Sequence, residues 1–209
     1  MKTKLNLLVV LTLVLATLAQ PSNARAGGGL GLSFRGPSAI ASFYNVSGCT
    51  VTEAFVIASQ FKQRDARGPA TSLSFASVTV SQFDLCADTL VLYAYGTASP
   101  LAPAELQISK KLNTAQLITT VPVFDEISGT NFDVSVDLSW TATGPLSRQQ
   151  ITTHFDTPGC ISNSHTQSRS RPAEASGTIS DGVTNFSPET SLSTSLESVK
   201  SGTVVIGCS

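Results

Sequence analysis

The segment from Asn131 to Ala142, NFDVSVDLSWTA, alternates apolar and polar side chains over its whole length. The apolar set includes Trp140, and the polar set includes Asp133 and Asp137. A period of two places successive side chains on opposite faces of a β-strand, so this pattern predicts a strand with one buried face. Each large apolar side chain buried there contributes roughly 1.5–3 kcal/mol, and the rest of the chain must supply a sheet to cover that face.

The first 26 residues have the three parts of a secretory signal peptide. Lys2 and Lys4 form a basic start, an apolar run follows from Leu5 to Leu18, and Ala24-Arg25-Ala26 fits a cleavage site. The alternative is a membrane anchor, but the apolar run is shorter than the ~20 residues that a spanning helix needs. We predict that residues 1–26 are removed and that the mature chain is secreted, extracytoplasmic and without a membrane span.

Removal of the signal peptide makes the chain acidic. Three of the thirteen Lys and Arg residues lie within residues 1–26, which leaves ten against fourteen Asp and Glu residues, a net charge of −4. Because nucleic acid is captured mainly through its phosphates, such a chain is not expected to bind it. Charged residues make up 13% of the sequence, against a usual ~25%, so the expected surface is polar but sparsely charged.

Alternating patterns between Gly, Pro, Asn and Asp residues predict further strands. The predicted strands are 39–46, 51–59, 72–83, 89–97, 106–110, 115–124, 131–142, 151–155, 164–171, 176–179 and 203–206. Residues 188–200 admit a helix, because Pro188 follows Ser187 and apolar residues recur at helical spacing. Their many Ser and Thr residues favour instead a hairpin that turns at Lys200 to Gly202.

These patterns predict an all-β fold, a mostly antiparallel β-sandwich of about nine to eleven strands. Residues 27–36, which begin with three glycines, are expected to be a flexible N-terminal segment. Residues 37–209 are expected to form a single disulfide-bonded β domain.

The chain has four cysteines, all after residue 26. An even number in an exported chain predicts two disulfides, with three possible pairings, and the lack of a C-x-x-C motif disfavours a zinc cluster. The segments IASFYNVSGC (40–49) and ITTHFDTPGC (151–160) share their first residue and a final Gly-Cys. One interpretation is that the two halves of the chain arose by duplication. The alternative is a chance match in a serine-rich sequence. Duplication predicts two pairings, Cys49 with Cys86 and Cys160 with Cys208.

A metal site is one interpretation of the only two histidines. His154, His165 and Asp156 come close together if Gly159-Cys160 is a tight turn, and they would offer two imidazoles and a carboxylate to zinc or copper. The alternative is that both histidines are exposed on a polar hairpin.

A calcium site is one interpretation of the acids near residue 125. Asp125, Glu126 and Asp133 supply the oxygen ligands that calcium prefers, although their spacing is not that of an EF-hand. The alternative is a set of solvated acids beside a strand end. We predict no cofactor, and if these three acids bind an ion, calcium is the ion that we expect.

Six residues are candidate ligand-binding groups. Tyr44, Tyr93 and Tyr95 would form a stacking platform for a glycan, and Arg148, Arg169 and Arg171 would bind an anion or an acidic sugar if neighbouring strands align them. The alternatives are tyrosines in the core and a charged sheet edge that resists aggregation.

No catalytic motif occurs in the sequence: there is no G-x-S-x-G, and a serine triad would have to use one of only two histidines. We therefore favour a secreted, non-catalytic binding or surface-associated module whose partner is a glycan or a cell-surface protein. An exported hydrolase with a site assembled from distant acidic residues is the alternative. A structural component of an extracellular layer is a third hypothesis.

Overall fold

The computed structural model describes residues 30–65, 68–187 and 191–206, and their regular structure is entirely β. The strands are β1 (Leu30–Ser47), β2 (Thr50–Asp65), β3 (Thr71–Asp84), β4 (Thr89–Ala98), β5 (Leu106–Ile108), β6 (Thr114–Asp125), β7 (Thr130–Ala142), β8 (Ser147–Thr157), β9 (Cys160–Ser180) and β10 (Ser193–Ile206). All of their pairings are antiparallel, which confirms the predicted all-β, sandwich-like fold. None of the described segments is a helix long and apolar enough to cross a membrane.

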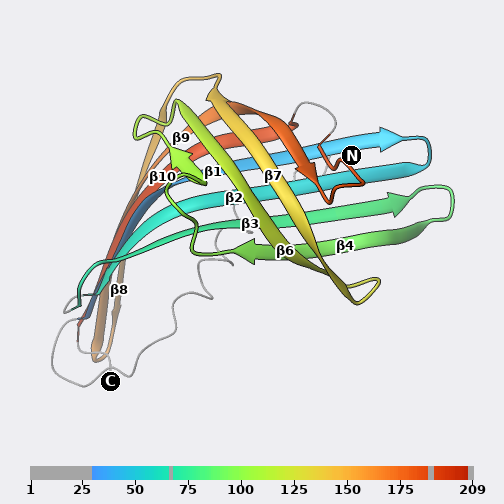
Figure 1. Cartoon of the computed structure of the whole chain (residues 1–209). Helices are drawn as coiled ribbons and strands as arrows, with labels where there is room; N and C mark the ends of the chain where they lie inside the picture. The colour runs from blue at the N-terminus through green and yellow to red at the C-terminus, as the bar shows by residue number, and fades with distance from the viewer. Residues whose placement is uncertain (1–29, 66–67, 188–190, 207–209) are drawn as a thin grey trace, which may run out of the picture.

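The strands form two layers that face each other (Figure 1). Strands β10, β1, β2, β3 and β4 lie side by side in one layer, and β6, β7 and the C-terminal part of β9 form the other. The layers are joined at both edges. Strand β4 pairs with β6 only through 94–96, while β9 pairs with β7 through 173–180 and with β10 through 161–172.

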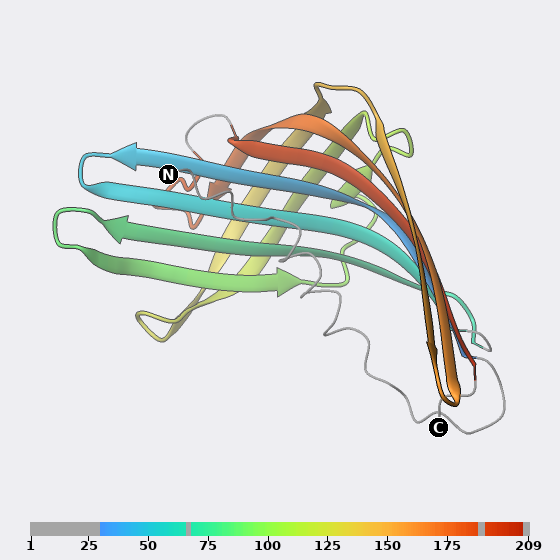
Figure 2. The ribbon, with the colours of Figure 1, turned by 180° about the vertical axis from the view of Figure 1, so that it is seen from behind.

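One end of the first layer extends beyond the second layer (Figure 2). In this extended part, the N-terminal half of β9 lies between β8 and β10, and β10 pairs in turn with β1. Strand β1 then pairs with the end of β2. The extended part is therefore a sheet in the order β8, β9, β10, β1, β2, with one face turned toward the second layer.

The hydrophobic core lies between the two layers. Buried alanines line it on the first layer: Ala39, Ala41, Ala54, Ala58, Ala76 and Ala94. The second layer supplies larger side chains, above all Trp140, which is 1% exposed. The indole N–H of Trp140 donates a hydrogen bond to the backbone oxygen of Ile40, 3.0 Å away. Burial alternates along β7, as the sequence predicts for this strand.

Two glycines allow the strands that join the layers to approach closely. A Cβ atom at Gly96 would lie 1.9 Å from the backbone oxygen of Pro122, and one at Gly177 would lie 2.0 Å from that of Asp137. Gly177 also has a φ of +132°, which side chains rarely permit. A larger residue at Gly96 would push β4 away from β6, where the layers are joined, and one at Gly177 would push β9 away from β7 within the second layer.

Strand β10 corrects the prediction for residues 188–200. It runs unbroken from Ser193 to Ile206, so the predicted turn at Lys200 to Gly202 is wrong, and so is the helix for the described part of the segment. The reason is that β10 lies between β1 and β9, which satisfy its backbone hydrogen-bonding groups on both sides. Residues 188–190 lie outside the described residues.

Other boundaries also differ from those read from the sequence, since β2 runs on to Asp65 and β8 begins at Ser147. The predicted strands 164–171 and 176–179 are parts of the single strand β9, which continues through Pro172. Strand β1 begins at Leu30, so it includes most of the segment 27–36 that was expected to be flexible. Residues 1–29, with the predicted signal peptide, lie outside the described residues.

The topology bears on the duplication. Strands β1, β2 and β3 form a three-stranded antiparallel unit, and so do β8, β9 and β10. Both hairpins have a turn of two residues. Cys49 lies inside its turn, between the paired Ser47 and Thr50, whereas Cys160 is itself paired, with Thr157. The two halves therefore share an order of strands, but their Gly-Cys motifs occupy different positions in the turn.

Candidate functional site

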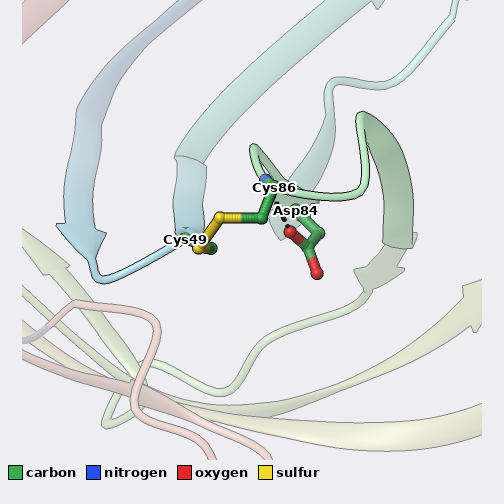
Figure 3. A group of neighbouring side chains, drawn as sticks. All are labelled: Cys49, Asp84 and Cys86. Carbon is green, nitrogen blue, oxygen red and sulfur yellow. Dashed lines mark hydrogen bonds between the residues drawn. A yellow bond between two sulfur atoms is a disulfide. The ribbon is translucent and has the colours of Figure 1, made fainter.

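The side chains of Cys49, Asp84 and Cys86 bring three possible metal-ligand atoms within 4.8 Å of one another (Figure 3). The two sulfur atoms form a disulfide, so neither is a thiolate that could bind a metal ion. An Asp84 carboxylate oxygen accepts hydrogen bonds from the backbone N–H groups of Cys86 and Ala87, at 2.8 and 3.0 Å. This cluster holds the turn after β3 against the start of β2 and is structural.

The observed disulfide is the first pairing that the duplication predicts. Cys49 and Cys86 are joined, with their Cα atoms 5.4 Å apart. Cys160 is also disulfide-bonded. Its predicted partner, Cys208, lies outside the described residues.

The two histidines lie on neighbouring strands but are not grouped with Asp156. Thr152 pairs with His165, and His154 pairs with Asn163, so the two imidazoles are diagonal neighbours on one exposed face. Each ring already has a partner: Nδ1 of His154 lies 2.6 Å from Oδ1 of Asn163, and Nδ1 of His165 lies 3.1 Å from Oγ1 of Thr152. Within the described residues, the histidines and Asp156 do not bring three ligand atoms within 4.8 Å.

The three acids considered for calcium have separate surroundings. Asp125 is 4% exposed at the end of β6, whereas Asp133 is exposed on β7. Glu126 accepts a hydrogen bond from the hydroxyl of Tyr95 at 3.1 Å. Within the described residues, these carboxylates do not form a group with ligand atoms within 4.8 Å.

Asp125 fixes the junction between β4 and β6. Its carboxylate accepts hydrogen bonds from the backbone N–H groups of Tyr93, Ile127 and Ser128, and from the hydroxyl of Ser128 at 2.6 Å. Burial alone raises the pKa of Asp125, but these hydrogen bonds outweigh burial and hold the pKa below its ordinary value of 3.8.

Replacement of Asp125 by alanine is expected to lower the free energy of unfolding at pH 7 by about 3 kcal/mol, because three N–H groups lose their acceptor. Since the folded-state pKa is depressed, the stabilisation is present above the unfolded-state pKa and is lost as the pH falls through the folded-state pKa. Urea unfolding should therefore show a difference from the native chain that shrinks toward pH 2. The exposed Asp133→Ala variant is the control, and an Asp125→Ala difference that did not change with pH would contradict this role.

Tyr93 and Tyr95 lie on the outer face of the first layer, opposite the buried Ala94, and are 37% and 45% exposed. Their ring centroids are 6.0 Å apart. The hydrogen bond and the negative charge of Glu126 raise the pKa of Tyr95. These tyrosines are not core residues, and Tyr93 borders a shallow groove of about 300 Å³ with Tyr44.

A larger groove lies on the inner face of the extended part of the first layer. It consists of two adjoining hollows, of about 1080 and 520 Å³, which share Arg169, Ser198 and Lys200. Six basic residues line it: Arg35, Lys62, Lys110, Arg148, Arg169 and Lys200. No Asp or Glu is among the described residues that line it. We call this feature the basic groove.

The strand register brings the charges of the basic groove into direct opposition. Arg35 on β1 pairs with Lys200 on β10 and with Lys62 on β2. Arg148 on β8 pairs with Arg169 on β9. Side chains that lie directly opposite in an antiparallel pair have Cβ atoms about 5 Å apart, so these like charges destabilise the sheet.

Of the three predicted arginines, Arg148 and Arg169 line the basic groove. Arg171 lies two residues further along β9 and is half-buried, and its guanidinium donates a hydrogen bond to Oδ1 of Asn113. Its Nε atom is buried without a hydrogen-bond partner. Sequence reasoning missed Arg35, Lys62 and Lys200, because only the pairing of β10, β1 and β2 brings them together.

The loop between β4 and β6 forms an apolar wall of the larger hollow. This wall contains Pro100, Leu101, Pro103, Ile108 and Leu112. Several hydrogen bonds hold the loop to the first layer, including those from Ser74 Oγ to the oxygen of Leu101 and from Gln60 Nε2 to that of Leu106, both at 2.7 Å. The basic groove therefore has a fixed apolar boundary on the side of the second layer.

Comparison with known proteins adds little to this description. No protein-family model matches the sequence, and no curated protein sequence matches it. One solved structure that matches is the crystal structure of "a putative AttH" from Nitrosomonas europaea, with 11% sequence identity and a TM-score of 0.35. The match covers 91% of this chain, which spans 58% of the length of that chain. No inference about function follows from so low a TM-score.

Proposed function

We propose that this chain is a secreted, non-catalytic module that binds anionic ligands in the basic groove. The observation that carries the proposal is the charge distribution: six basic side chains line one face without an Asp or Glu, although the chain as a whole has more acids than bases. Like charges held in direct opposition cost stability, and a bound anion offsets that cost. Secretion is supported by the signal pattern of residues 1–26 and by the Cys49–Cys86 disulfide.

The chemistry of the basic groove favours binding over hydrolysis. Glycoside hydrolysis requires two carboxyl groups on either side of the scissile bond, and the residues that line this groove supply none. The described residues that line the groove also include no histidine, the side chain used most often for general acid–base catalysis. The strength of arginine and lysine is in charge-assisted hydrogen bonds to carboxylate, sulfate and phosphate groups.

The test is retention of the chain, expressed without residues 1–26, on immobilised dextran sulfate at pH 7 and low salt. We expect retention that added salt abolishes, and no retention on uncharged dextran. The double variant Arg35→Glu and Lys200→Glu should bind at least ~10-fold more weakly, because two attractive charges become repulsive.

The matched control is Lys111→Glu. Lys111 is exposed beside Lys110 but does not line the basic groove, so its reversal should have little effect on retention. Equal loss of binding in the control and in the double variant would assign binding to general surface charge. Absence of retention in the native chain would overturn the proposed function.

A further inference from the structure

The basic groove has an extended shape that selects among anions. Five of its six basic residues, all but Lys110, occupy five neighbouring strands in the order β8, β9, β10, β1 and β2. Adjacent strands lie about 4.8 Å apart, so five strands span about 19 Å across the sheet. A small anion would contact only two or three of these side chains, whereas a linear polyanion that crosses the strands would contact all of them.

The charges follow two neighbouring rows of paired residues. In one row, Arg148 faces Arg169, and in the next, Lys200, Arg35 and Lys62 face one another in turn. Because Arg169 and Lys200 line the same hollow, the two rows form one continuous line of positive charge from β8 to β2. The regular interval between strands suits a ligand whose negative charges also repeat at a regular interval.

Neutral side chains between these charges are suited to sugar hydroxyl groups. Gln150 and Gln167 pair with each other beside Lys200, and Ser198 lies beside Arg169. Amides and hydroxyls both donate and accept hydrogen bonds, as a carbohydrate requires. The two rows contain no aromatic side chain, and among the described residues that line the groove Phe61 is the one aromatic, so successive nucleic-acid bases would find no row of rings on which to stack.

We infer that the ligand of the basic groove is a linear acidic polysaccharide, carrying carboxylate or sulfate groups, that lies across strands β8, β9, β10, β1 and β2. This inference rests on the proposed function and specifies its ligand. The outer edge of β8 has no strand paired with it among the described residues, so the chain of sugars continues past the groove at that side.

The test is a length series of oligogalacturonates, from two to eight sugars, with a parallel series of sulfated oligosaccharides, titrated at fixed ionic strength. Affinity should rise by ~100-fold from two sugars to six, because each added anionic sugar releases counterions and meets another basic side chain. The increase should then level off, since about five strands carry the charges. This result in either series supports the inference.

Variants at the ends of the groove separate a long site from a local one. Arg148→Gln and Lys62→Gln lie at opposite ends, so each should weaken binding of the six-sugar ligand by about 5- to 10-fold and leave the two-sugar ligand almost unchanged. Lys111→Gln is the control and should change neither. Equal losses for short and long ligands would overturn the inference.

Other outcomes distinguish this inference from the proposed function. If two sugars bind as tightly as eight, the basic groove binds small anions and only the polysaccharide inference fails. If a single-stranded DNA oligomer of equal charge binds more tightly than the sugars, the ligand class is wrong. If no anion binds, the proposed function fails together with the inference.

Discussion

Replacing Trp140 by alanine should lower the free energy of unfolding by about 5 kcal/mol. Trp140 is the largest of the fully buried side chains, and it spans the space between the two layers. Six buried alanines lie on the opposing first layer, and their short side chains cannot fill the cavity that its removal would leave. The hydrogen bond from the indole to Ile40 would also be lost, which leaves a backbone oxygen without its partner.

Guanidinium unfolding followed by far-UV circular dichroism measures this effect, because Trp140 is the only tryptophan and its fluorescence disappears in the variant. Trp140→Phe keeps most of the apolar volume and should lose roughly half as much stability. Thr141→Ala changes an exposed neighbour on the same strand and should stay within about 0.5 kcal/mol of the native chain. A loss below about 2 kcal/mol in Trp140→Ala would show that the layers do not depend on this contact.

Strands whose pattern is complete within one segment were predictable from the sequence. Apolar and polar residues alternate along β7, and burial alternates along β6 although Ile118 and Phe124 lie on its exposed face. The observed bounds, Thr114–Asp125 and Thr130–Ala142, lie within two residues of the predicted ones. The same local information predicts which side of each strand is buried. It requires no knowledge of the neighbouring strands, because the alternation of side chains is a property of a single chain segment.

The ends of β9 and β10 were not predictable in this way, because tertiary pairing overrides local preferences there. Pro172 and Gly177 are ordinary signals of a break, yet β9 continues through both. Gly177 lies so close to the backbone of β7 that a Cβ atom would not fit there, so the packing of β9 against β7 decides its conformation. A preference measured over a few residues contains no information about such a close approach.

The basic groove was even harder to predict from the sequence. The sequence offers Arg148 and Arg169 as anion-binding residues if neighbouring strands align them, whereas Arg35 belongs to a segment expected to be flexible. Net charge was also a poor guide, because a total that is slightly negative does not describe how the charges are distributed. The pairing of β8, β9, β10, β1 and β2 decides that distribution, and it depends on contacts between distant parts of the chain.

Removal of the Cys49–Cys86 disulfide by paired alanine substitutions should lower the free energy of unfolding by about 4 kcal/mol. The bond joins residues 37 positions apart, so its loss gives the unfolded chain the freedom of a long loop. Loss of the disulfide should also leave the turn after Asp84 less firmly held. The Asp84 carboxylate accepts hydrogen bonds from the N–H groups of residues 86 and 87 in this turn. Guanidinium unfolding without reductant leaves the disulfide of Cys160 intact and measures the effect of this bond alone.

The matched control for the disulfide is Leu85→Ala, which changes an exposed residue in the same turn. It should alter stability by less than about 1 kcal/mol. The paired cysteine variant should also show a larger dependence of the unfolding free energy on denaturant, because its unfolded chain exposes more surface. Since the disulfide joins the β1–β2 turn to the end of β3, away from the residues that line the basic groove, affinity for dextran sulfate should not change. A stability loss below about 1 kcal/mol would show that the turn is held by the Asp84 hydrogen bonds and that the disulfide adds little to them.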